Sequence, residues 1–353
     1  MRPLLVCLIA ASCLPARAEE LHLSTDGGRT WEARGPRDHV LTALTPDTRD
    51  PASAWAVAQP TAASLPAGEN PKFASPVLLH TSDGGKTWEK NSAYRGADPV
   101  CVAIDPSNSS TIYVGGWFES ISRSTDGGRT WQKLDLGELG KSRPQTTQNT
   151  SRNVGSIAIK GDSILACFEH VRAGFLALSE DAGKTWRQIH DYACMSCVFF
   201  GDRIVACGSA WRVVSSGDLG KTWVELRKIC CQSDGGYSAF SLSPDGKELL
   251  FVCRDIAMSC RPGEDWKTWE QPAPDEAIMD TVLLGKEVLA LVRKGEFWDH
   301  RIPGRPHFRE RGGAQLKARD ASGQWTLRRL PEGGEPKQLL RSCDGSAVWL
   351  LTR

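Results

Sequence analysis

The sequence predicts an all-β fold: a seven-bladed β-propeller of four-stranded antiparallel blades, with the last blade shared by the N- and C-terminal parts of the chain. Three observations lead to this prediction. An octapeptide of the form S/T-x-D-x-G-x-T-W recurs along the 353 residues, the chain around each copy divides into four short apolar runs, and the two ends of the chain carry complementary halves of one such unit. A motif that returns at a fixed period indicates a repeat architecture.

Five copies of the octapeptide are intact. Its Ser or Thr and its Asp can accept hydrogen bonds from backbone N–H groups in a turn, and its Gly tolerates a positive φ. Its Trp offers a large apolar surface to a neighbouring sheet. We therefore expect these residues to close hairpins rather than to perform chemistry. They are Ser24, Asp26, Gly28, Trp31, Thr81, Asp83, Gly85, Trp88, Ser124, Asp126, Gly128, Trp131, Ser179, Asp181, Gly183, Trp186, Ser216, Asp218, Gly220 and Trp223.

Two degenerate copies complete a set of seven. Pro262–Trp269 keeps Thr268 and Trp269, and Asp320–Trp325 keeps little beyond its tryptophan. Seven units in the chain after residue 18 give about 48 residues per unit, close to the period of a four-stranded propeller blade. The repeat count therefore predicts seven blades.

The third unit shows the four runs most clearly. They are Pro99–Ile104, Thr111–Gly115, Glu119–Arg123 and Trp131–Leu134, with the octapeptide between the third and the fourth. Short β-type runs that are separated by turn residues are typical of an antiparallel meander. We expect each unit to hold four strands, with the octapeptide as the hairpin between strands three and four.

The ends of the chain support a shared blade. The first octapeptide follows residue 18 so closely that the N-terminal part supplies only a third and a fourth strand, whereas Gln338–Arg353 shows the pattern of a first and a second strand. Pairing these halves completes one blade and leaves no exposed sheet edge.

The first 18 residues have the features of a secretory signal peptide. Arg2 supplies a positive charge, Leu4–Leu14 is apolar, and Ala16 to Ala18 is a small-x-small cleavage site. We expect residues 19–353 to form a single propeller domain that is exported to the periplasm or the extracellular space, without a transmembrane segment. A lipoprotein signal that uses Cys13 is the alternative.

Charge and cysteine content narrow the function classes. With 43 basic and 42 acidic residues, the chain offers no electrostatic basis for nucleic-acid binding. Ten of its twelve cysteines follow residue 18; Cys167, Cys207 and Cys253 lie in apolar runs and are expected to be buried thiols, while Cys230 and Cys231 are better disulfide candidates. No motif for a metal, a cofactor or a phosphate is present, so none is expected.

The octapeptides resemble those of the Asp-box, or bacterial neuraminidase repeat, propellers. This group includes sialidases, sortilin-type receptors, xyloglucanases and proteins like the photosystem II stability/assembly factor. The resemblance covers nearly all of the chain after residue 18. It implies that the boxes lie at the periphery, on the face away from the ligand site.

The opposite face is therefore the expected binding face. We call it the loop face; it is formed by the loops from strand two to strand three and from strand four to the next strand one. Its longest loops are expected at Pro60–Pro76, Asp135–Arg152 and Lys294–Gly313, and long loops on a rigid scaffold often carry function. Candidate binding residues there are Trp117, His170, His190, Trp211, Trp298, His300 and Arg301.

Two functions remain open. The favoured hypothesis is a non-catalytic scaffold, most like the photosystem II assembly-factor group, that binds a protein partner or a glycan through its loop face; no catalytic residue is assigned. The alternative is a glycoside hydrolase of the sialidase type, which would need an arginine cluster and a Tyr–Glu nucleophile pair. The Arg-Ile-Pro signature of sialidases normally precedes the first box, whereas here Arg301–Pro303 lies near the C-terminal end. This displacement favours the scaffold.

Overall fold

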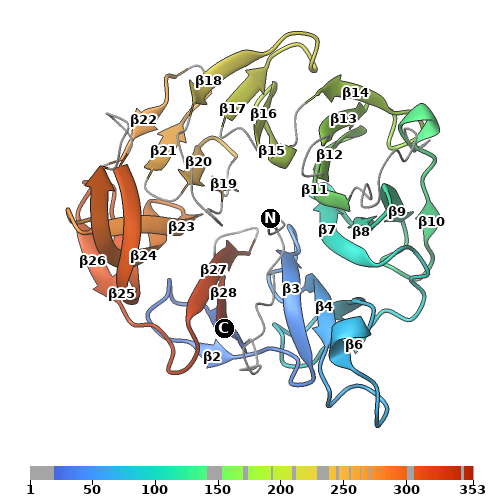
Figure 1. Cartoon of the computed structure of the whole chain (residues 1–353), viewed down its shortest axis with the longest axis horizontal. Coiled ribbons are helices and arrows are strands. Elements are labelled where there is room, and N and C mark those ends of the chain that lie inside the picture. Colours follow the sequence, from blue (N-terminus) through green and yellow to red (C-terminus); the bar gives the residue numbers. More distant parts are fainter. Residues whose placement is uncertain are drawn as a thin grey trace. The chain divides into compact units, whose positions relative to one another are not determined.

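The structure is a computed structural model that describes residues 20–140, 153–169, 174–191, 194–208, 212–228, 238–243, 246–253, 256–262, 264–269, 272–299, 306–342 and 346–352. These residues form seven four-stranded antiparallel sheets (Figure 1). The fold is a seven-bladed β-propeller, as predicted. The predicted signal peptide lies outside the described residues.

The chain divides into two compact units, and each is described by itself. The described residues of the first unit lie within 36–228, and those of the second lie within 20–35 and 238–352. The first unit contains four blades and the second contains three. That residues 19–353 form a single domain stays a prediction.

The first unit holds four consecutive blades, each a meander in chain order. Their strands are β3 (His39–Pro46), β4 (Ala54–Pro60), β5 (Val77–Thr81) and β6 (Glu89–Lys90); β7 (Pro99–Asp105), β8 (Asn108–Gly116), β9 (Ser120–Ser124) and β10 (Gln132–Lys133); β11 (Asn153–Lys160), β12 (Ser163–Glu169), β13 (Phe175–Ser179) and β14 (Arg187–His190); and β15 (Cys194–Phe200), β16 (Arg203–Gly208), β17 (Arg212–Ser216) and β18 (Val224–Lys228).

The second unit holds two further meanders and the shared blade. Its strands are β19 (Ser238–Leu242), β20 (Leu249–Cys253), β21 (Ile256–Cys260) and β22 (Lys267–Thr268); β23 (Glu276–Leu284), β24 (Glu287–Asp299), β25 (Pro306–Arg319) and β26 (Trp325–Arg328); and β27 (Pro336–Arg341), β28 (Val348–Thr352), β1 (Glu20–Ser24) and β2 (Glu32–Ala33).

The shared blade confirms the prediction drawn from the ends of the chain. Strand β1 pairs with β28 in antiparallel register, with Leu21 opposite Leu351 and Leu23 opposite Trp349. All five residues of β28 are buried. The N-terminal and C-terminal parts therefore meet in the middle of one sheet rather than at its edge.

Within each unit, the first strands of successive blades pack against one another: β3 against β7, β7 against β11, β11 against β15, and β19 against β23, which in turn contacts β27. Six of these strands carry a β-bulge or irregularity near their start, such as the one at Gly155 in β11 and the one at Met279 in β23. A bulge increases local twist and redirects side chains. In this protein the bulge recurs at the end of the first strand that lies toward the loop face.

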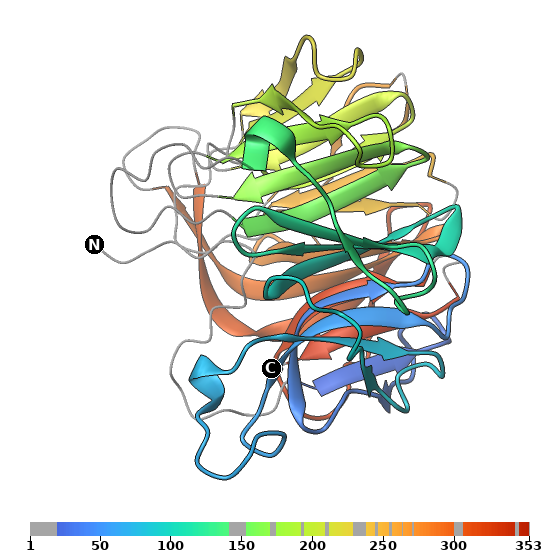
Figure 2. The same ribbon diagram turned by 90° about the vertical axis from the view of Figure 1, so that its right-hand side faces the viewer.

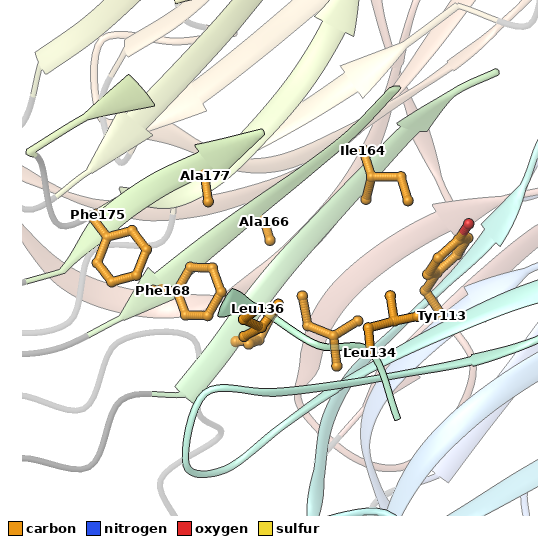
Figure 3. Close-up of a cluster of buried hydrophobic side chains, with 10 residues drawn as sticks. Tyr113, Leu134, Leu136, Ile164, Ala166, Phe168, Phe175 and Ala177 are labelled. Carbon is orange, nitrogen blue, oxygen red and sulfur yellow. The ribbon is translucent and has the colours of Figure 1, made fainter. Parts of the chain in front are cut away.

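The apolar core lies between neighbouring blades. Figure 3 shows one such cluster, in which Leu134 and Leu136 from the end of one blade meet Ile164 and Phe168 of the next. The rings of Phe168 and Phe175 stack with centroids 4.4 Å apart. Blade-to-blade burial of this kind holds a propeller together, because each single sheet is too thin to form a core of its own.

The structure corrects the expectation of a long loop at Lys294–Gly313. Strands β24 and β25 continue as an antiparallel ladder as far as the pairing of Asp299 with Pro306, with Phe297 opposite Phe308. Figure 2 shows this pair of orange strands extending past the other strands of their blade. The sequence hides the extension because charged residues interrupt its apolar pattern.

The described residues contain two short 3-10 helices, η1 (Pro71–Phe73) and η2 (Gly137–Gly140). No helix in the described ranges has the length and apolar character needed to cross a bilayer.

Candidate functional site

Each intact octapeptide forms a hairpin that is closed by its own side chains. In the third copy, Ser124 Oγ donates to Asp126 at 2.8 Å and accepts from the Gly128 N–H at 2.8 Å. The carboxylate of Asp126 accepts from the Thr130 N–H at 2.9 Å and from the Thr130 hydroxyl at 2.6 Å. These hydrogen bonds, the Thr130 hydroxyl first, lower the pKa of Asp126 to about 2. The carboxylate is fully engaged in the turn.

The other four copies repeat these contacts. The Asp accepts from the Thr hydroxyl at 2.6 or 2.7 Å in every one of them. The Ser or Thr hydroxyl accepts from the N–H of the glycine three residues before the tryptophan at 2.7 to 2.9 Å. Such saturated carboxylates are poor candidates for acid–base catalysis.

The octapeptide hairpins also join neighbouring blades. Gly128 has a φ of 84°, and a Cβ there would lie 2.4 Å from the indole of Trp55 in the preceding blade. Trp131 Nε1 donates to Asn91 Oδ1 of that blade at 3.2 Å. The glycine thus lets the preceding blade approach the hairpin closely, and the hydrogen bond of the tryptophan stabilises this contact.

The degenerate copy at Asp320–Trp325 retains more than its tryptophan, which corrects the expectation. Asp320 lies five residues before Trp325, the same spacing as between Asp26 and Trp31. Its Oδ1 accepts from the Ser322 N–H at 2.8 Å and from the Gln324 N–H at 3.0 Å. Hydrogen bonding, chiefly from the Ser322 hydroxyl, lowers the pKa of Asp320.

On the loop face of the first unit, the connection between β8 and β9 presents an exposed aromatic side chain. Phe118 is 72% exposed, and it and Glu119 adopt φ values of 58° and 55°. This left-handed region is costly for bulky side chains and is found where surrounding structure enforces it. The half-buried Trp117 next to them donates its backbone N–H to Asp98 O at 3.1 Å.

The neighbouring blade presents a second exposed aromatic on the same face. Phe73, in η1 of the connection between β4 and β5, is 86% exposed. Gln59 Nε2 donates to the carbonyls of Pro71 at 2.9 Å and Ala74 at 2.6 Å, and Asn70 caps the helix. These contacts hold the connection in a defined shape, so Phe73 is displayed from an anchored loop.

A half-buried glutamate with one buried carboxyl oxygen lies at the loop-face end of β12. Glu169 faces Gly155 in the bulge of β11, where a Cβ would lie 2.1 Å from Glu169 Oε1. Among the described residues, neither this Oε1 nor the buried Oδ1 of the opposing Asn153 has a hydrogen-bond partner. Burial raises the pKa of Glu169 to about 8. The carboxyl is therefore mostly protonated at neutral pH.

The second unit has a buried carboxyl with a clear structural partner. Asp280, which follows the bulge in β23, accepts from the Leu339 N–H of β27 at 2.8 Å and from the Thr281 N–H at 2.8 Å. Burial outweighs these two hydrogen bonds and raises the pKa of Asp280 to about 7. The group links the first strands of two neighbouring blades.

The candidate binding residues are distributed unevenly. Trp117 lies on the loop face beside Phe118. His190 lies at the end of β14 and packs edge-on against the octapeptide Trp223, with ring centroids 4.9 Å apart; burial lowers its pKa. Trp298 lies in the backbone ladder of β24 and β25. His170, Trp211, His300 and Arg301 lie outside the described residues.

Sequence reasoning missed Phe73, Phe118 and Glu169. A phenylalanine among polar and small loop residues was the available signal for Phe73, whereas Phe118 directly follows Trp117 and carried no separate signal. Glu169 had no such signal, because its burial depends on a bulge in another strand. Among the described residues, no group of three or more His, Cys, Asp or Glu side chains is placed to hold a metal ion.

Comparison with known proteins agrees with the fold. A model of the family described as "Sortilin, neurotensin receptor 3" matches residues 77–214. A comparison with curated protein sequences gives no significant match.

Solved structures share the architecture at low identity. YCF48 from Cyanidioschyzon merolae is 16% identical with a TM-score of 0.54, and the match covers 90% of this chain and 97% of that one. The GH74 xyloglucanase from Xanthomonas campestris is 14% identical with a TM-score of 0.59; the match covers 91% of this chain but 51% of the enzyme. A protein from Lactobacillus plantarum is 16% identical with a TM-score of 0.52, over 88% and 95% of the two chains. This chain therefore spans about half the length of the xyloglucanase.

Proposed function

We propose that the protein is an exported, non-catalytic propeller that binds a protein partner through the loop face of its first unit. The observation that carries the proposal is the pair of exposed phenylalanines, Phe73 and Phe118, on the loop face of adjacent blades. Large aromatic side chains that are held in fixed positions lose little entropy on binding and commonly anchor protein interfaces.

The backbone at Phe118 supports this proposal. Its left-handed conformation, together with that of Glu119, has an unfavourable energy that a glycine or asparagine would relieve. Strain of this kind is characteristic of functional positions. YCF48 from Cyanidioschyzon merolae shares the propeller fold over nearly all of both chains.

A test compares apolar side chains on different parts of the surface. Phe73→Ser with Phe118→Ser removes the loop-face aromatics. As the control, Val224→Ser with Leu327→Ser removes two exposed apolar side chains from the fourth strands β18 and β26. A photo-crosslinker is placed at residue 118 or, as its control, at residue 327, in cells that make the protein. We expect a defined adduct from residue 118 alone.

The double serine variants then decide whether the aromatics anchor the partner. We expect purified protein carrying Phe73→Ser and Phe118→Ser to lose the partner identified by the crosslink, and the control pair to retain it. Equal retention by both pairs, or an adduct only from residue 327, would contradict the proposal.

A second candidate function is a glycoside hydrolase, which the protonated carboxyl of Glu169 favours. A general acid of a glycosidase needs a raised pKa, and a second carboxylate roughly 5–10 Å away must act as nucleophile or base. The test measures turnover of a fluorogenic sialoside and of xyloglucan oligosaccharides. Turnover that is lost in Glu169→Gln but kept in the control Glu69→Gln would establish this function. We expect no turnover by the wild-type protein.

A further inference from the structure

A cavity of about 890 Å³ lies between two blades of the second unit, the blade of β19–β22 and the blade of β23–β26. It is lined by the two degenerate octapeptides: Lys267 and Trp269 come from one, and Asp320 and Trp325 from the other. This cavity lies at the octapeptide ends of the strands of these two blades.

The two blades pack through a buried apolar cluster, and the cavity opens beside it, where the glycine contact of the intact octapeptides is missing. The glycine three residues before the tryptophan is buried in all five intact octapeptides. In four of these copies the glycine faces side chains of the preceding blade; these glycines are Gly28, Gly128, Gly183 and Gly220. Counted from Trp325, the same position in the degenerate copy is Ser322, which is exposed. The hairpin at Asp320 therefore does not close the groove.

An arginine takes the place of that packing. The guanidinium carbon of Arg319 lies 4.7 Å from the centroid of the Trp269 ring and 6.0 Å from that of Trp325. Stacking on an indole is favourable for a guanidinium and fixes its plane. The N–H donors at the edge of that plane are arranged to bind a planar oxyanion through two parallel hydrogen bonds.

The charges that line the cavity are unbalanced. Arg261, Lys267, Lys286 and Arg319 face two carboxylates, Glu248 and Asp320. Glu248 lies 3.5 Å from Arg261, and Lys267 lies 3.1 Å from Glu264 outside the cavity lining.

Two of the four cationic side chains in the cavity lining are not neutralised by these ion pairs. The Oδ1 of Asp320 is engaged in its own turn. Within the described part of the chain, Lys286 and Arg319 have no carboxylate partner.

We propose that this cavity binds a small organic molecule that carries a carboxylate or sulfate group, with Arg319 and Lys286 as its anion-binding residues. The volume is in the range of pockets for organic ligands and exceeds the need of an inorganic ion. The hydroxyls of Ser259 and Thr268 and the amide of Gln324 also line the cavity and supply hydrogen-bonding groups for the rest of such a molecule.

Isothermal titration of the full-length protein tests the proposal with four probes: D-glucuronate, D-glucose 6-sulfate, uncharged D-glucose and inorganic sulfate. We expect saturable one-to-one binding of at least one charged sugar and none of glucose. Arg319→Ala is expected to weaken that binding at least about tenfold, because a charged, two-point hydrogen bond is lost. Arg319→Lys, which keeps the charge but loses the planar fork, is expected to weaken it as well.

Two further variants keep the test independent of folding. Lys286→Glu changes an exposed turn residue and is expected to weaken binding while the melting temperature is unchanged. Lys184→Ala, at an exposed position in an intact octapeptide, is the matched control and is expected to bind as the wild type does.

The outcomes are decisive in both directions. Absence of saturable binding of either charged sugar, or the same affinity in Arg319→Ala and Lys184→Ala, would overturn the proposal. Inorganic sulfate binding as tightly as the sugars would show an adventitious ion only. None of these results bears on the loop-face aromatics.

Discussion

At the scale of single residues, carboxyl groups in this protein have pKa values moved in opposite directions by their surroundings. Asp126 lies in a turn whose N–H and O–H donors stabilise its ionised form, so its pKa falls to about 2. Glu169 is half-buried, and its buried Oε1 has no hydrogen-bond partner among the described residues, so burial raises its pKa to about 8. The first carboxylate stabilises the fold at neutral pH, whereas ionisation of the second opposes it.

The direction of the pKa shift of Glu169 predicts how the stability of the protein depends on pH. In the unfolded chain a glutamate has a pKa of about 4.3, so the folded state binds its proton more tightly. The stabilising effect is fully present below about pH 4.3 and is lost as the pH rises toward 8; the loss is about 4 kcal/mol by pH 7. We expect Glu169→Gln, which keeps the shape and cannot ionise, to remove this loss.

Denaturant unfolding at pH 5 and pH 8 measures the effect. The free energy of unfolding of Glu169→Gln should exceed that of the wild type at pH 8 by more than at pH 5. The exposed Glu69→Gln serves as control and should follow the wild type at both values. Parallel pH profiles for all three proteins would show that Glu169 has an ordinary pKa.

At the scale of elements, the octapeptide hairpin is a self-contained turn that also contacts the preceding blade. Its Asp organises the turn, its Gly lets the preceding blade approach, and its Trp reaches across to that blade, as Trp223 Nε1 does to Ile189 O at 2.9 Å. Where the motif has decayed, between the blades of β19–β22 and β23–β26, the groove is open and basic. Local sequence thus determines whether the hairpin closes the groove between two blades at their octapeptide ends.

Asp126→Asn tests the role of the turn carboxylate. The amide oxygen can accept one hydrogen bond from Thr130, but the amide NH2 group would then face the other donor of Thr130. We therefore expect a lower melting temperature at pH 7. Because the pKa of Asp126 is lowered, its contribution is present above about pH 3.9 and is lost as the pH falls toward 2. The difference between wild type and variant should therefore shrink at low pH.

Asp202→Asn is the matched control, because Asp202 is an exposed turn residue whose ion pair with Lys160, at 3.1 Å, contributes little. Thermal melts followed by circular dichroism compare the three proteins. If Asp126→Asn melted no lower than Asp202→Asn, the octapeptide carboxylate would not be stabilising the hairpin.

At the scale of the whole molecule, the blade of β27, β28, β1 and β2 joins residues from both ends of the chain into one sheet. Its centre is Trp349, which is fully buried and lies opposite Leu23. We expect Trp349→Ala to lower the free energy of unfolding by about 3–5 kcal/mol, the range for a buried large-to-small change. Trp117→Ala, at a half-buried loop position, should cost far less. Urea denaturation compares the two; equal losses would mean that the shared blade adds no particular stability.

The repeat made the fold predictable, because Asp and Trp at fixed spacing specify a hairpin wherever they occur. Boundaries such as Pro99–Ile104 against the observed β7 (Pro99–Asp105) agree for the same reason. The candidate sites were harder to predict because they depend on contacts between blades. Phe118 looks like any apolar residue until its exposure is known. The environment of Glu169 is set by Gly155 in another strand, and Arg319 is recognised as a candidate binding residue only from its stacking on Trp269 of the neighbouring blade.

The hydrogen bond from the Thr352 hydroxyl to Glu20 O spans a sequence separation of 332 residues. Contacts so distant along the chain raise the entropic cost of loop closure and slow folding. Until the ribosome has released the residues of β28, the strand β1 has no partner on that side and its backbone is open to pairing with other chains. The strand near the N-terminus is therefore the segment for which protection during synthesis matters most.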